Sequence, residues 1–196
     1  MTRPQAWEIV KKYVKNENLR RHMLAVEAAM AGYWEYFSKE EGKGKKEEGG
    51  ELGLSENWKM VGLLHDFDWE IHPTLEEHPQ KGEAILEKEG LAENLRRAIL
   101  SHAEHIGVLR ETLMEKTLFA VDELSGLIVA VALMKGRKLE NVAVESVLKK
   151  FKQKSFAAGV NRQDVEQGAE SLGIPLEKHI EIVLEGMKKI APELGL

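Results

Sequence analysis

Side chains that could bind a metal ion are spread over the first two thirds of this chain. Asp122 lies in the middle of Thr117–Met134, a segment that is otherwise strongly apolar. An unpaired carboxylate buried there would cost several kcal/mol, roughly the penalty for burying an unpaired polar group. A nearby cation would remove that cost. The chain offers further ligands upstream, in the order His22, His65, Asp66, His78 and His102.

These residue types define the chemistry of the predicted site. Imidazole nitrogens and carboxylate oxygens suit divalent manganese, iron, cobalt, nickel or zinc, whereas magnesium is less suited to so much histidine. The chain has no cysteine, which excludes disulfides and thiolate ligands. A single histidine on an apolar helix face is more often a core residue than a ligand, but the ordered set favours metal binding. The sequence predicts a site for one or two divalent ions.

The order H…HD…H…H…D resembles the metal-binding signature of the HD superfamily of metal-dependent phosphohydrolases. The surrounding segments GLLHD, HPxxG, AIxxH and AVDELSG resemble the HDIG-type blocks of that family, over roughly residues 20–133. Phe67-Asp68 replaces the usual Ile-Gly after the doublet, and no Gly-Tyr-Pro element follows. These differences disfavour a cyclic-dinucleotide phosphodiesterase. The chain is most similar to predicted HD hydrolases with an HDxDxE variant and a Lys-rich later segment.

The resemblance implies both a ligand set and a reaction. One ion would be bound by His22, His65, Asp66 and Asp122, and a second by His78 and His102, with Asp66 bridging the two. Metal-activated water would then hydrolyse a phosphomonoester or phosphodiester without a covalent intermediate. The expected substrate is a nucleotide or another small phosphorylated metabolite. The alternative is a regulatory module that retains the metal or nucleotide pocket without turnover.

Further side chains are candidates for catalysis and substrate binding. Asp66 is expected to act in catalysis as the bridging ligand, and Asp68 or Glu70 could orient a ligand imidazole or donate a proton. A phosphate ester also benefits from a cation near the pocket. The candidates for substrate binding are Arg21, Lys149, Lys152 and Arg162, although a Lys-rich run is more often a solvated helix face. The remaining histidines, His72, His105 and His179, are expected to have surface, supporting or structural roles.

Apolar residues recur at helical spacing along most of the chain, and no convincing alternating strand pattern occurs. We therefore expect an all-α protein, and the resemblance implies a single HD-type domain, 1–196, of about eight to ten helices. The charged, glycine-interrupted segment 38–50 is expected to be a flexible loop. Residues 141–196 are expected to form a helical extension that packs on the core.

Helix signals place the predicted ligands on specific elements. A helix over about 18–37 would direct His22 inward with Val26, Ala29 and Tyr33. A helix capped by Ser55 would end at the His65-Asp66 doublet. The other expected helices are one capped by Thr2, one from Pro79 to Gly90, one over 92–105 that carries His102, one with Asp122 that ends at Gly136, and three more after residue 141, with a break near Gly159 and a start at Pro175.

Composition narrows the class of protein. Of the 33 acidic residues 29 are Glu, and 20 of the 28 basic residues are Lys, a bias that leans towards a thermophilic source. A net charge of −5 without a basic face disfavours nucleic-acid binding. The N-terminal segment has no signal-peptide core, and the apolar run Leu127–Met134 is shorter than the roughly 20 residues of a membrane span. We expect a cytoplasmic protein without membrane contact and with a small phosphorylated partner.

Overall fold

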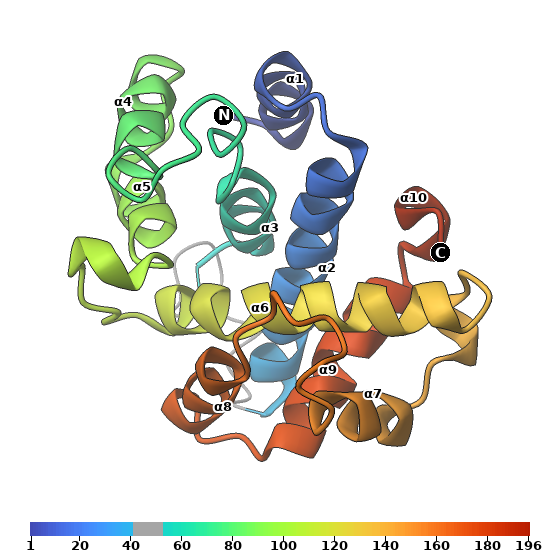
Figure 1. Ribbon diagram of the computed structural model, residues 1–196. Coiled ribbons are helices and arrows are strands. Elements are labelled where there is room, and N and C mark those ends of the chain that lie inside the picture. The colour runs from blue at the N-terminus through green and yellow to red at the C-terminus, as the bar shows by residue number, and fades with distance from the viewer. Residues whose placement is uncertain (41–52) are drawn as a thin grey trace.

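The computed structural model describes residues 1–40 and 53–196, and this part of the chain folds into helices without any strand (Figure 1). The prediction of an all-α protein with eight to ten helices is confirmed. The helices are α1 (Arg3–Tyr13), α2 (Glu17–Glu40), α3 (Ser55–Leu64), α4 (Gln80–Lys88), α5 (Glu93–Leu100), α6 (Leu113–Met134), α7 (Val144–Phe151), α8 (Arg162–Ser171), α9 (Leu176–Lys188) and α10 (Ala191–Leu194).

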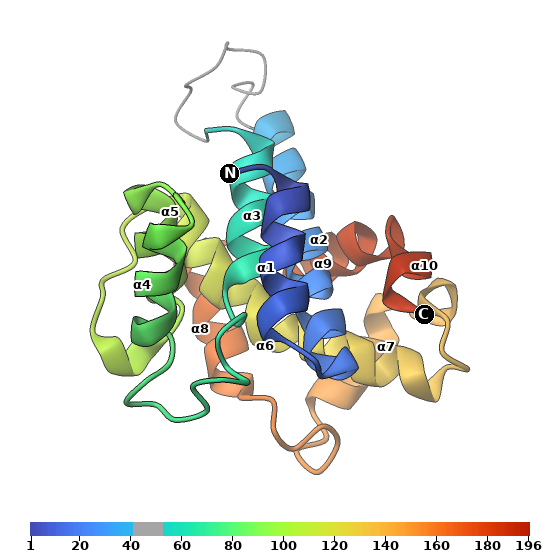
Figure 2. The same cartoon turned by 90° about the horizontal axis from the view of Figure 1, so that it is seen from above.

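The core lies where α2 crosses α6, with α3 and α9 packed on α2 (Figure 1). Val26, Ala29 and Tyr33 of α2 are fully buried, so the predicted inward stripe is the one that the fold uses. The same face carries His22 towards α6, because residues four and seven positions apart share one side of a helix. Seen from above, α1, α2 and α3 lie side by side, and α4 and α5 flank α3 on its outer side (Figure 2).

The C-terminal helices pack on the same core. Helices α7, α8 and α9 all contact α6, and α9 also contacts α2. Helix α8 approaches α6 very closely at Gly168, where an added Cβ would lie 2.5 Å from the Cα of Ala120. A glycine is therefore needed at this crossing, two residues before Asp122 along α6. The C-terminal third thus bears directly on the helix that carries a predicted ligand.

Several predicted boundaries differ from the structure. Ser55 is the first residue of α3 and Leu54 occupies the cap position. The helix predicted over 92–105 ends at Leu100, because the Ser101 hydroxyl and the His102 ring bond the carbonyls of Ala98 and Ile99. His102 therefore lies in a turn. Four helices rather than three follow residue 141. Of the predicted loop 38–50, residues 38–40 belong to α2 and 41–50 lie outside the described residues.

By length and hydropathy alone, α6 could cross a membrane. However, 61% of its most apolar stretch is buried inside the protein. The core helix of a soluble protein can have the same length and hydropathy. The apolar character of α6 is explained by its central place in the core. A cytoplasmic location and the absence of membrane contact stay predictions.

A buried histidine connects the three central helices. The Nε2–H group of His179 on α9 donates to the carbonyl oxygen of Ala120 on α6 at 2.9 Å, and the Tyr33 hydroxyl of α2 donates to its Nδ1. Burial lowers the pKa of His179 to about 4, because the charged imidazolium would lose its hydration in the core. His179 is therefore a neutral structural residue, with both ring nitrogens in hydrogen bonds.

The lowered pKa of His179 predicts a specific acid sensitivity. The unfolded chain binds a proton at this residue near pH 6.5, whereas the folded protein binds it only near pH 4. The free energy of unfolding should therefore fall as the pH drops from about 6.5 to about 4. Below that range, protonation of His179 should lower it no further. Chemical denaturation of His179→Gln over the same pH range should show a smaller decrease in the free energy of unfolding than the wild type. Equal pH slopes in the two proteins would contradict the assignment, because the other histidines titrate in both.

Candidate metal centre

The first group of predicted ligands comes from three helices that meet at the site. His22 lies on α2, His65 is the C-cap residue of α3, and Asp122 lies on α6. The Nε2 atom of His22 is 2.9 Å from Oδ1 of Asp122 and 3.1 Å from Nε2 of His65. The Nε2 atom of His65 is 3.5 Å from the same Asp122 oxygen. These three ligand atoms could hold one metal ion.

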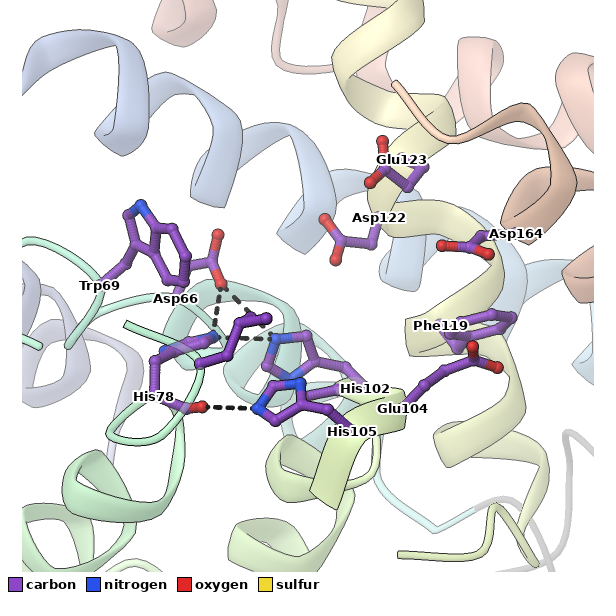
Figure 3. Close-up of a pocket in the computed structure, with 12 residues that line it drawn as sticks. Asp66, Trp69, His78, His102, Glu104, His105, Phe119, Asp122, Glu123 and Asp164 are labelled. Carbon is purple, nitrogen blue, oxygen red and sulfur yellow. Dashed lines mark hydrogen bonds and ion pairs between the residues drawn. The ribbon is translucent and has the colours of Figure 1, made fainter. Parts of the chain in front are cut away.

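The second group lies on the adjoining turns. His78 precedes α4, and His102 follows α5. Their Nε2 atoms are 3.2 Å apart, and they lie 3.3 and 3.5 Å from Oδ1 of Asp66 (Figure 3). His78, His102 and Asp66 thus form a second set that could hold a metal ion.

The Asp66 carboxylate joins the two groups. Its Oδ1 faces His78 and His102, whereas its Oδ2 lies 3.4 Å from Nε2 of His65 and 3.6 Å from Nε2 of His22. With metal–ligand bonds of about 2.0–2.2 Å, neighbouring ligands of one ion lie roughly 3–3.5 Å apart. The observed separations match the edges of such a coordination shell. The donor set therefore fits two cations that share Asp66.

Hydrogen bonds on the outer side of the rings orient the imidazoles. The Nδ1 atoms of His65 and His102 lie 2.8 and 2.5 Å from the carbonyl oxygens of Gly62 and Ile99. The Nδ1 atom of His78 lies 2.8 Å from Oδ1 of the buried Asp68. An Nδ1–H group that donates outward leaves the Nε2 lone pair free to face a metal. Three of the four ligand histidines are held in this way.

The HPxxG block has a geometric explanation. The backbone N–H of Gly82 donates to Oδ2 of Asp68 at 3.1 Å, and a Cβ on residue 82 would lie 2.4 Å from Cγ of Asp68. Only glycine leaves room for this carboxylate beside α4. Asp68, one of the two residues considered as a partner of a ligand imidazole, is therefore placed beside His78 by the start of α4.

The electrostatics of the cluster favour positive charge. Burial disfavours the charged form of His65, but the adjacent Asp66 and Asp122 carboxylates raise its pKa well above the usual value. Hydrogen bonds with Asp66 and Asp68 likewise outweigh burial and raise the pKa of His78 to about 9. The neighbouring histidines lower the pKa of Asp122. Protons or metal ions can supply the positive charge that this group of ligands requires.

Both groups open into one cavity of about 300 Å³ (Figure 3). Four of the candidate ligands line this cavity: Asp66, His78, His102 and Asp122. The remaining lining residues are Trp69, Leu75, Ala103, Glu104, His105, Phe119, Glu123 and Asp164. A small molecule in this cavity would contact the ligands of both groups.

Two predicted residues near the ligands in sequence are not in the site. The Glu70 carboxylate accepts hydrogen bonds from the backbone N–H groups of Lys15 and Asn16, at 2.7 and 2.9 Å. Glu70 does not line the cavity. It stabilises the turn between α1 and α2 instead of pointing to a reacting group. Arg21 immediately precedes His22, and its side chain is rotated by about 100° from His22 around α2. Its guanidinium donates to the Leu194 carbonyl and to Asn18, so it anchors the C-terminus.

The basic residues of the C-terminal third are also placed elsewhere. Lys149 lines a different cavity beside Val131 and Met134 of α6. Val131 is nine residues beyond Asp122, which corresponds to roughly 13 Å along the helix axis. Lys152 is exposed at the end of α7. Arg162 donates to the carbonyls of Phe156, Ala157 and Val160, so it holds a loop rather than a phosphate.

The sequence did not identify the residues that line the remainder of the cavity. Three of them, Glu104, His105 and Glu123, are close in sequence to the candidate ligands His102 and Asp122. Their place in the cavity could have been predicted from this proximity. Burial and the charge of Asp122 raise the pKa of Glu123 to about 7, so this carboxyl lies in a less hydrated, negatively charged environment. Asp164 had no such signal, because it comes from α8, about 40 residues later in the chain.

Comparisons with protein-family models, with curated proteins and with solved structures found no match to this chain. The resemblance to HD phosphohydrolases therefore rests on the residue pattern alone.

The geometry predicts two metal sites that can be lost separately. His22→Ala and His102→Ala should each bind about one ion fewer per chain than the wild type, whereas Asp66→Ala should weaken both sites, because each Asp66 oxygen faces a different group. Elemental analysis and calorimetric titration with manganese, cobalt and zinc would measure this. His72→Ala is the control, since His72 belongs to neither group. One ion at saturation in the wild type would contradict the two-site arrangement.

The close contact at Gly82 provides an independent test of the second site. An alanine there would displace the Asp68 carboxylate, so His78 would lose the partner that orients its ring. We expect Gly82→Ala to weaken binding at the second site about 10–100-fold, the usual cost of losing such a partner, while the first ion stays bound. Gly159→Ala is the matched control, because a Cβ there meets no atom within 4 Å. Unchanged binding of both ions by Gly82→Ala would show that Asp68 does not support His78.

Proposed function

We propose that the protein is an HD-type metal-dependent phosphohydrolase that acts on a small phosphate ester. One observation carries the proposal: the two oxygens of Asp66 face two separate ligand groups that open into the same cavity. Pairs of cations joined in this way are typical of enzymes that transfer phosphoryl groups to water. The proposal agrees with the ordered histidine and aspartate pattern of the sequence.

The roles of the residues follow from their positions. His22, His65 and Asp122 would hold one divalent ion, His78 and His102 the other, and Asp66 both. Such ions would polarise a phosphoryl oxygen and lower the pKa of a water molecule. The protein supplies the orientation: Gly62, Ile99 and Asp68 fix three of the imidazole rings, and the core helices α2, α3 and α6 bring the first group together.

The size of the cavity favours a small substrate. A volume of about 300 Å³ lies at the lower end of the range of roughly 300–1,000 Å³ for small-molecule pockets. A phosphomonoester of a short metabolite would fill it, whereas a dinucleotide would extend well outside. We therefore favour a small phosphorylated metabolite over a cyclic dinucleotide.

Activity assays on metal-reloaded protein would test the proposal. We expect the metal-free protein, reloaded in turn with manganese, iron, cobalt, nickel, zinc or magnesium, to release phosphate from small monoesters, with the least activity for magnesium. His65→Ala and Asp122→Ala should reduce kcat to the background rate, because each removes a ligand. Glu70→Gln should keep most of its activity, because Glu70 lies outside the cavity.

The outcome also separates the proposal from its main rival. If fully loaded protein hydrolyses none of a panel of monoesters, nucleotides and diesters but binds a nucleotide tightly, the protein is a regulatory module and the phosphohydrolase assignment is wrong.

A further inference from the structure

The cavity beside the metal ligands has two further kinds of wall. Carboxylates that are not ligands, Glu104, Glu123 and Asp164, lie on the side of α6 and α8, as Figure 3 shows. Trp69 and Leu75 form an apolar wall near His78. Trp69 packs edge-on against the His78 ring, with the ring centroids 5.0 Å apart. A substrate in this cavity would therefore meet metal ligands, an apolar surface and a negatively charged surface.

The charges in the cavity do not balance for an anionic substrate alone. Two divalent ions would bring four positive charges, of which Asp66 and Asp122 offset two. A phosphate dianion would offset the other two. The non-ligand carboxyl groups would then need either protons or a further cation, because carboxylates in a partly buried site are costly when they are unpaired.

The protein itself supplies little positive charge to these carboxylates. Among the described residues, no lysine or arginine lines the cavity. Arg110 stacks over Phe119 at 3.7 Å and pairs directly with Glu104 at 2.9 Å. Its charge also acts on Asp164 without a direct ion pair, and the Asn161 side chain is a neutral hydrogen-bond partner of Asp164. Glu123 accepts a backbone N–H from Asn161 at 3.1 Å, which is a neutral partner. Glu123 and Asp164 are thus left as the acceptors that face the ligand space.

We propose that the substrate carries a protonated amine on its alcohol portion, which lies against Asp164 and Glu123 while the phosphate lies at the metal ligands. The inference rests on the proposed phosphohydrolase function and specifies its substrate class: a short amino-alcohol phosphate. The carbon chain between the two charged ends would run along Phe119, which lies beside Asp164 (Figure 3). The ammonium group supplies the charge that the acidic wall lacks, and an uncharged or anionic alcohol portion does not.

The reaction is an ordinary hydrolysis in this arrangement. The P–O bond to the alcohol breaks, a new P–O bond forms to the oxygen of water, and the leaving alkoxide takes up one proton from that water. The products are inorganic phosphate and the free amino alcohol. The amine keeps its proton throughout, so it acts in recognition only.

Matched esters would test the substrate class. The probes are 3-aminopropyl phosphate, propyl phosphate and 3-hydroxypropyl phosphate, which differ only in the terminal group. With metal-loaded wild-type protein, we expect kcat/KM for the amino ester to exceed that of each ester with an uncharged end group by about two- to fivefold, the size of a single favourable charge interaction in a partly exposed site.

A matched pair of variants on α8 would localise the effect. Asp164→Asn should reduce the preference for the amino ester, because only Glu123 would then face the amine, whereas Glu166→Gln should leave the preference unchanged. Glu166 is an exposed acid two residues further along the same helix and does not line the cavity. Turnover of the esters without a preference, or an equal preference for the hydroxyl ester, would overturn the inference while the phosphohydrolase function stands.

A binding measurement separates the inference from the proposed catalysis. Calorimetry would compare 3-aminopropylphosphonate with propylphosphonate, neither of which can be hydrolysed at an ester bond, on the metal-loaded protein. We expect the amino compound to bind about two- to fivefold more tightly, and Asp164→Asn to reduce the difference. If this holds while no ester is hydrolysed, the recognition of the amine is supported and the catalytic proposal fails. Equal binding of the two phosphonates would contradict the amine inference.

Discussion

The structure depends on the convergence, on a small space, of six side chains that could bind metal ions. Two carboxylates and four imidazoles point their lone pairs at one another over distances near 3 Å. Such an arrangement is repulsive unless protons or cations occupy it, so the rest of the protein must hold it in place. Three outward hydrogen bonds and the packing of α2, α3 and α6 do so. Metal binding would relieve the repulsion and would therefore also stabilise the fold.

The convergence of the candidate ligands and the positions of most helices could be predicted because local rules determine them. His22 shares a stripe with Val26 and Tyr33, and all of this stripe faces the core. His65 ends α3 and His78 precedes α4, at positions that the helix start and stop signals indicate. Gly90 and Gly136 adopt left-handed backbone angles just beyond helix ends, as expected of glycine at these positions. Each inference needed only a few neighbouring residues.

The other residues that line the cavity could not be predicted because they depend on helix orientation and tertiary contacts. Lys149 had the charge expected of a phosphate-binding residue, but its helix packs beside the far end of α6. Glu70 lies close to the doublet in sequence, but the free N–H groups before α2 bind its carboxylate. Asp164 reaches the cavity only because α8 crosses α6 at a glycine. No pattern within a single segment indicates such a crossing.

The C-terminal third supports the site through α6 rather than by contributing metal ligands. His179 binds the carbonyl of Ala120, and Gly168 allows α8 to lie against the same residue. Arg162 holds the loop that ends at Asn161, whose N–H binds Glu123. All three contacts act within one helical turn of Asp122. A change in these helices would therefore shift a metal ligand and the acidic wall together, so that stability and specificity depend on the same packing.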